Sequence, residues 1–208
     1  MTASFTPYYK RKNKFAKLLS ILLLATLFQG ALAQEISIKS AEIAVNNESY
    51  LLNAEFDLEL NSTLEEVINK GVPLYFLIDF QLTKPRWYWF PEKISSQMQM
   101  LRVSYHALTR QYRLSSGALY QQFATLNEAL RTLSKIRNWQ VVEKDVLQKN
   151  SSYRANLRMR LDTTQLPKPF QVDALTTKEW RLSSDWKRWK VDTGVIQNAA
   201  SDFIEEEK

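Results

Sequence analysis

The stretch YRANLRMRLD, residues 153–162, decides how this chain folds. Apolar and polar side chains alternate through it without a break. The apolar set is Tyr153, Ala155, Leu157, Met159 and Leu161, and the polar set is Arg154, Asn156, Arg158, Arg160 and Asp162. Successive side chains of a strand point to opposite faces, so this alternation predicts a β-strand with one buried and one solvated face.

Other segments show the same preference for strands. The alternation returns in residues 53–60, while residues 74–82 are apolar on both faces except at Asp79 and Gln81, which indicates a central strand. Further strands are predicted at 36–45 with a bulge and a turn at Asn46-Asn47, at 98–114 with a bend near His106, at 119–123, around 141–142, at 170–174 and at 179–191.

Helices are few and short. Ser62 and Glu65 have the spacing of a capping box and Gly71 fits a helix end, so residues 63–70 are predicted to be helical. Thr125 and Glu128 predict a second helix that carries one apolar face. The strands are joined by connections too short for parallel crossovers. The fold class is therefore mainly β: an antiparallel sandwich or incomplete barrel with a covering helix.

The N-terminal residues resemble a secretory signal. Five cations in residues 10–17 precede an apolar run at 18–28, and Ala31 and Ala33 occupy the two positions that a signal peptidase reads. The run is about half the ~20 residues of a membrane-spanning helix. We expect a signal peptide at 1–33, one β-rich domain at 34–195 and a flexible acidic tail at 196–208; an uncleaved anchor is the alternative.

Composition narrows the possible partners. The chain has a formal charge of +6, but without the five cations of the leader it is about +1. The basic character therefore belongs to targeting and gives no support for a nucleic-acid partner. The chain has no cysteine, although export leads to an oxidising compartment, so packing alone must hold the domain. We expect a periplasmic protein with no stable membrane span after processing.

An aromatic run, KPRWYWFPEK at residues 84–93, is the first candidate for a site. It sets Trp87, Tyr88, Trp89 and Phe90 between two prolines. If the run is extended, its rings fall on two faces, and we expect one pair to be structural and the other available for contact. The alternative is that both faces are covered. Tyr and Trp are enriched where proteins meet partners.

Rings and cations also alternate near the C-terminus. Trp186 and Trp189 lie among lysines and arginines, and the polar face of the 153–161 strand carries Arg154, Arg158 and Arg160. Stacking of these rings between guanidinium groups would contribute on the order of 0.5 to 1 kcal/mol per contact at an exposed site. The alternative is core tryptophans with solvated cations between them.

Several blocks resemble one protein family. LRVSYHALTRQYRLSSGALYQQFATLNEALRTL at 101–133, QLPKPFQVDAL at 165–175, SSDW at 183–186 and RWYWF at 86–90 are similar to segments of an exported proteobacterial family that carries a domain of unknown function. The resemblance covers most of the chain after residue 33. It implies no activity or catalytic residues. It implies a partner, because genes of that family tend to lie beside a membrane sensor kinase of the nitrogen-regulation type.

The side chains offer few routes to catalysis. There is a single histidine, His106, no cysteine and no phosphate-binding glycine motif. His106 could act as a base with Ser104, or it could bond structurally at the predicted bend. No metal, cofactor or catalytic residue is predicted. Carboxylates paired in space are not visible in a sequence, so a hydrolase remains open.

These observations predict a non-enzymatic binding or accessory protein that contacts another envelope component, for example a membrane sensor kinase. The alternatives are an envelope hydrolase using carboxylates and a carrier of an apolar ligand. A cleft with facing Asp or Glu would favour the hydrolase, and a cavity lined by Trp and Phe would favour the carrier. A filled core with an exposed aromatic edge would favour the binding protein.

Overall fold

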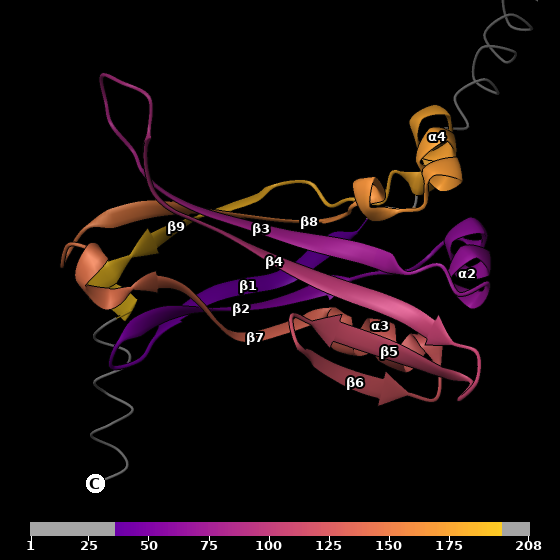
Figure 1. Ribbon diagram of the computed structural model, residues 1–208. Coiled ribbons are helices and arrows are strands. Elements are labelled where there is room, and N and C mark those ends of the chain that lie inside the picture. Colours follow the sequence, from indigo (N-terminus) through magenta and orange to yellow (C-terminus); the bar gives the residue numbers. More distant parts are fainter. Residues whose placement is uncertain (1–35, 197–208) are drawn as a thin grey trace, which may run out of the picture. The chain divides into compact units, whose positions relative to one another are not determined.

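Two antiparallel β-sheets form the framework of the computed structural model, which describes residues 36–196 (Figure 1). All of these residues lie in one unit of the chain, Ala33–Lys208. The smaller sheet has the strand order β1-β2-β7, and its strands are β1 (Ser37–Val45), β2 (Ser49–Asp57) and β7 (Lys135–Glu143). The predicted bulge in the first strand is confirmed by a register shift between Ile38 and Ser40.

The larger sheet has six strands in the order β6-β5-β4-β3-β8-β9. They are β3 (Leu74–Lys84), β4 (Glu92–His106), β5 (Gln111–Ser116), β6 (Leu119–Phe123), β8 (Ser152–Leu161) and β9 (Lys187–Asp192). The predicted strand at 153–162 is β8, which pairs with β3, with Leu157 opposite Phe80. Since β3 has β4 on its other side, the prediction of a central strand is confirmed.

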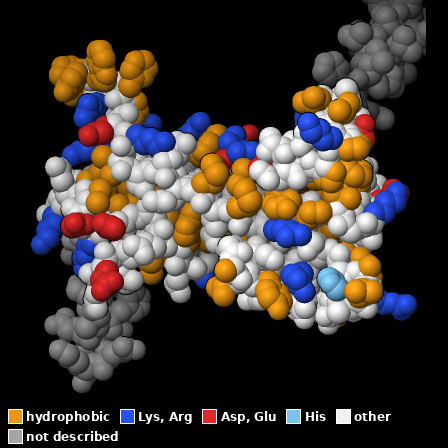
Figure 2. Space-filling model, in the orientation of Figure 1, with side chains coloured by type: hydrophobic (Ala, Val, Ile, Leu, Met, Phe, Trp, Pro, Cys, Tyr) orange, Lys and Arg blue, Asp and Glu red, His pale blue; other side chains and the backbone are white. Residues whose placement is uncertain are grey.

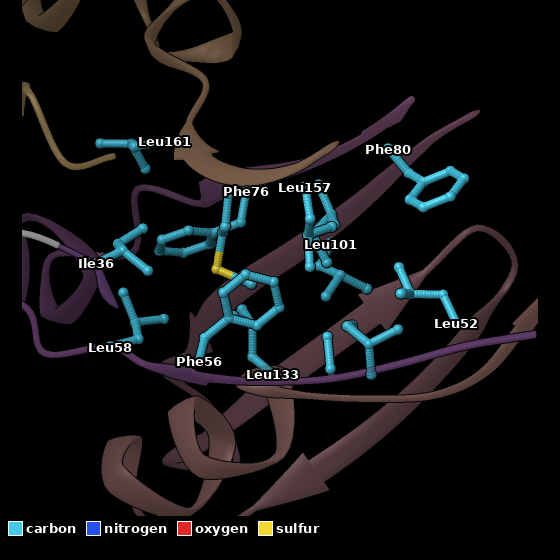
Figure 3. Close-up of a cluster of buried hydrophobic side chains, with 14 of the residues drawn as sticks. Ile36, Leu52, Phe56, Leu58, Phe76, Phe80, Leu101, Leu133, Leu157 and Leu161 are labelled. Carbon is cyan, nitrogen blue, oxygen red and sulfur yellow. The ribbon is translucent and has the colours of Figure 1, made fainter. Parts of the chain in front are cut away.

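The core lies between the two sheets. Phe56 and Leu52 of β2 face Phe76 and Phe80 of β3 and Leu157 of β8 (Figure 3). A fully buried Leu or Phe side chain contributes about 1.5 to 3 kcal/mol, so these facing rows supply much of the stability of a protein without disulfides. The expected sandwich is confirmed, with no closed barrel among the described strands.

The helix α3 (Leu126–Leu133) covers one side of this sandwich, as predicted. Thr125 accepts a hydrogen bond from the backbone of Glu128, and the Glu128 side chain accepts one from the backbone of Thr125, which completes the capping box. Ala129, Leu130 and Leu133 are buried. Because α3 contacts β5 and β6 of one sheet and β7 of the other, it helps to hold the sheets together.

The helix α2 (Ser62–Asn69) was predicted with its start one residue late. Asn61, not Ser62, is the N-cap, because Asn61 Oδ1 accepts the Leu64 N–H at 2.9 Å. The predicted end is confirmed. Gly71 has a φ of +90°, and Val72 N–H donates to the Val67 carbonyl, as in a Schellman motif.

Three strand predictions were wrong in detail. The bend near His106 is a full hairpin turn between β4 and β5, with Arg110 in the left-handed region. Residues 170–174 belong to the helix α4 (Lys168–Thr176), which Pro169 starts because its fixed φ suits a first turn. Within 179–191 only β9 is a strand, because the Ser184 hydroxyl accepts the Met159 N–H at 3.0 Å and interrupts the regular ladder.

Among residues 36–196, no helix is long and apolar enough to cross a membrane. The predicted signal peptide with Ala31 and Ala33, and the tail from residue 197 onward, lie outside the described residues.

Candidate functional site

The four rings of the aromatic run occupy the connection between β3 and β4. The last pair of the ladder joins Lys84 to Glu92. Pro85 and Pro91 stand just beyond it, and since proline cannot donate to a ladder, pairing ends there as expected. The connection extends beyond the strands (Figure 1). We call Trp87, Tyr88, Trp89 and Phe90 the aromatic tip.

Every ring of the aromatic tip is exposed to solvent. The relative exposures are 94% for Trp87, 66% for Tyr88, 70% for Trp89 and 81% for Phe90. Figure 2 shows hydrophobic side chains gathered at this protruding end. Both earlier expectations, a split into one structural and one available pair and full cover on both faces, are wrong. The residues form a bent loop and not a strand, so two alternating faces do not exist.

Neighbouring rings of the tip pack against each other in pairs. The centroids of Trp87 and Tyr88 are 5.1 Å apart and those of Trp89 and Phe90 are 6.2 Å apart, both edge to face. Such pairs contribute about 0.5 to 1.5 kcal/mol beyond their buried area. The rings therefore restrain one another, although no core supports them.

The base of the tip is fixed by polar contacts. Arg86 Nη2 lies 2.6 Å from Glu92 Oε2 across the two ends of the loop. Lys84 Nζ donates to Gln148 Oε1 at 2.6 Å, and the same ammonium group lies 5.9 Å from the centroid of Tyr153. These contacts anchor the loop to the sheet on both sides while its rings face water.

The second predicted constellation is only partly assembled. The guanidinium carbon of Arg158 lies 4.5 Å from the centroid of Trp186, as cation–π stacking requires. Trp189 pairs with Ala155 and packs, half-buried, against the hydrophobic core. Among residues 36–196, Arg154 and Arg160 stack on no ring, and Arg160 contacts a carboxylate instead.

That carboxylate is Asp79, which the sequence analysis had noted only as a polar exception in an apolar strand. Asp79 Oδ2 accepts from Arg158 Nη2 at 2.9 Å and from Arg160 Nε at 3.2 Å. Its side chain is 11% exposed. An acidic residue in the middle of a central strand, opposite an arginine-bearing strand, was the signal that could have predicted this triad.

A cleft of about 460 Å³ has carboxylates in its lining, the residue type that a hydrolase would require. It lies between β2, α2 and α3, and the acidic residues in its lining are Glu55, Asp57, Glu59 and Glu65. Cations also line it, and Lys39 Nζ lies 3.1 Å from Asp57 Oδ1. Asp57, Glu59 and Glu65 are exposed, whereas a general acid is usually kept protonated by burial.

The histidine, a second pocket and the metal-ligating residue types were the remaining candidates for a site. Thr109 N–H donates to His106 Nδ1 at 3.4 Å within the β4–β5 turn, which fits the structural alternative for that histidine. A pocket of about 290 Å³ between β4 and α3 has no Trp or Phe in its lining, unlike the cavity expected of a carrier. In the described part of the chain, no three His, Cys, Asp or Glu side chains come close enough to hold a metal ion.

Comparison with known proteins identified a family for the chain, and no individual relative or solved structure. Residues 33–190 match the family model described as Domain of unknown function (DUF4390). A search of curated proteins and a search of solved structures each gave no match. The match includes β1 to β8, the aromatic tip and most of β9. It confirms the part of the resemblance that pointed to a domain of unknown function; the proteobacterial source, the export and the gene neighbourhood stay predictions. The chain belongs to the DUF4390 family.

Proposed function

We propose that the protein is a non-enzymatic binding or accessory protein of the periplasm, which docks on another envelope protein through the aromatic tip. The observation that carries this proposal is the exposure of all four rings at the end of an anchored hairpin. Exposed apolar clusters of this kind mark interaction surfaces. Trp and Tyr are also the residues that most often dominate binding energy at such surfaces.

The form of the tip supports a protein as the partner. A narrow loop with rings already paired edge to face suits insertion into a concave pocket, because little ordering remains to be done on binding. The family resemblance makes a membrane sensor kinase the first partner to examine. A lipid surface is the competing class of partner, since Trp and Tyr also favour the membrane interface.

The test places a photo-crosslinking amino acid at position 87 of the exported protein, with position 108 as the control. Leu108 is 93% exposed in the β4–β5 turn, so it matches Trp87 in exposure and differs in location. We expect position 87 to crosslink one envelope protein that position 108 does not. The crosslinked protein is identified by mass spectrometry and then purified.

Binding of the purified partner is then measured directly. Truncating a binding hot spot costs about 2 kcal/mol or more, a loss of roughly 30-fold. We expect that loss for Trp87→Ala and Trp89→Ala and no change for Leu108→Ala. If position 87 crosslinks only to lipid and vesicle binding depends on Trp87, the partner is a membrane surface and not a protein. Equal crosslinking from both positions would refute docking through the tip.

A hydrolase remains the second candidate, favoured only by the four carboxylates in the cleft beside α2. If the cleft is catalytic, Glu55→Gln or Glu65→Gln should abolish cellular function while the urea midpoint stays unchanged. If the tip carries function, these variants should behave as wild type. The two proposals therefore predict opposite results for the same variants.

A further inference from the structure

A square of two arginines and two serines lies on the face of the larger sheet that points away from the core. In the β4–β5 ladder, Arg102 pairs with Ser115 and Ser104 pairs with Arg113. Alternate residues of a strand share a face. The core residue between them, Val103, is fully buried on the other face. The four polar side chains therefore converge on one patch of the outer face.

This patch is the floor of a pocket of about 220 Å³. Tyr105, His106 and Tyr120 complete its polar lining, and among the described residues no Asp or Glu lines it. Figure 2 shows the single histidine of the chain beside Lys or Arg side chains on the surface of β4, β5 and β6. The pocket is thus cationic and rich in hydrogen-bond donors.

Aromatic rings hold both guanidinium groups. The guanidinium carbon of Arg113 lies 4.5 Å from the centroid of Tyr120, and that of Arg102 lies 5.8 Å from the centroid of Tyr75. Stacking occupies the flat face of a guanidinium and leaves its N–H edge for an acceptor.

We propose that this pocket binds a phosphate group. A guanidinium binds phosphate through two parallel N–H donors, and the two serine hydroxyls add further donors on the same floor. Phosphate carries more acceptor oxygens and a larger negative charge than a carboxylate, so it matches a floor of two arginines and two serines better. The pocket is smaller than the roughly 300 to 1,000 Å³ of drug-sized ligand sites. It therefore suits a free phosphate or a terminal phosphate group.

The site is separate from the aromatic tip. The tip joins β4 at Glu92, and Ser104 lies near the other end of that strand. At about 3.3 Å per residue the separation is about 40 Å. Loss of phosphate binding would therefore leave docking through the tip unaffected, and loss of docking would leave phosphate binding unaffected.

The test is titration of the purified domain with inorganic phosphate at constant ionic strength, followed by amide NMR shifts. Wild type should saturate, with the largest shifts in β4 and β5. Arg113→Gln and Arg102→Gln should each weaken binding by about tenfold or more, the usual scale for one charge-assisted contact. Arg102 is exposed, so its variant keeps the fold even if Arg113→Gln lowers stability.

The matched control is Arg188→Gln, which removes the same charge from β9 outside the pocket and should bind like wild type. Vesicles containing phosphatidic acid distinguish the source of the phosphate. Binding to them that depends on Arg102 would assign a lipid headgroup, and binding of free phosphate alone would assign a soluble anion. A shift that never saturates, or equal weakening by Arg188→Gln, would overturn the proposal.

Discussion

Trp87 and Trp180 each stand beside an arginine in the sequence, yet they have opposite surroundings. Trp87 is 94% exposed at the aromatic tip, whereas Trp180 is 4% exposed and its centroid lies 5.7 Å from that of Phe170. The difference follows from what surrounds each segment. Two prolines release the tip from the ladder, while a helix and a 3₁₀ turn fold the Trp180 segment back onto β8. Local composition identifies aromatic residues, and the backbone decides whether they are buried in the core or exposed to solvent.

The sharpest test of this comparison is removal of the buried ring. Trp180→Ala should lower the free energy of unfolding by about 3 to 5 kcal/mol, because it leaves a cavity beside Phe170. Urea unfolding followed by circular dichroism measures the shift in midpoint. A variant as stable as wild type would mean that this region, like the tip, contributes little to folding.

Asp79→Asn should have the next largest effect. The neutral amide leaves Arg158 and Arg160 without their shared carboxylate. We expect a loss of about 1 to 3 kcal/mol, since the guanidinium groups are partly solvated and water replaces part of the contact. Glu92→Gln is the matched control. The ion pair between Glu92 and Arg86 is more exposed and should contribute about 1 kcal/mol or less to the free energy of unfolding. Equal urea midpoints for the two variants would contradict this ranking.

Trp186→Leu should lower the free energy of unfolding by less than Asp79→Asn. Leucine keeps an apolar body on β8 but removes the ring that Arg158 stacks on. The cation–π contact contributes about 0.5 to 1 kcal/mol. A double-mutant cycle with Arg158→Gln isolates this coupling, and a coupling energy of zero would show that the ring and the cation are merely neighbours.

The aromatic tip should give the smallest effect on stability. Trp87→Ala and Trp89→Ala should each change the free energy of unfolding by about 0.5 kcal/mol or less, as is usual for exposed positions. The same variants should bind the proposed partner less tightly. Removing a ring is therefore expected to lower stability at Trp180 and to lower binding affinity at the aromatic tip. A loss comparable to that of Trp180→Ala would mean that the tip packs against something within its own chain.

The elements that were predictable from sequence are those in which one strong local signal acts alone. The alternation in β8 admits only a strand, and the Thr125 box specifies the first turn of α3 through two reciprocal hydrogen bonds. Segment 170–174 failed because its apolar spacing suits a short strand or one helical turn equally well. In this segment, Pro169 and the contact of Phe170 with Trp180 favour the helix.

The candidate sites were harder to predict because they depend on pairing. An acidic residue in an apolar strand indicates a cationic partner, but only the strand registers identify Arg158 opposite Asp79 and Arg113 opposite Ser104. The alternating faces assigned to the aromatic run required a strand, and the prolines at its ends were the sign that no strand would form there.

The pairing of β2 with β7 determines the order in which the strands of the smaller sheet come together. Ser49 pairs with Glu143, so nearly half of the chain separates the two partners. The edge of β2 that faces away from β1 stays unpaired until β7 is present, and contacts so distant in sequence form slowly. During synthesis this unpaired edge is open to pairing with other chains, which exposes the β1–β2 hairpin to aggregation.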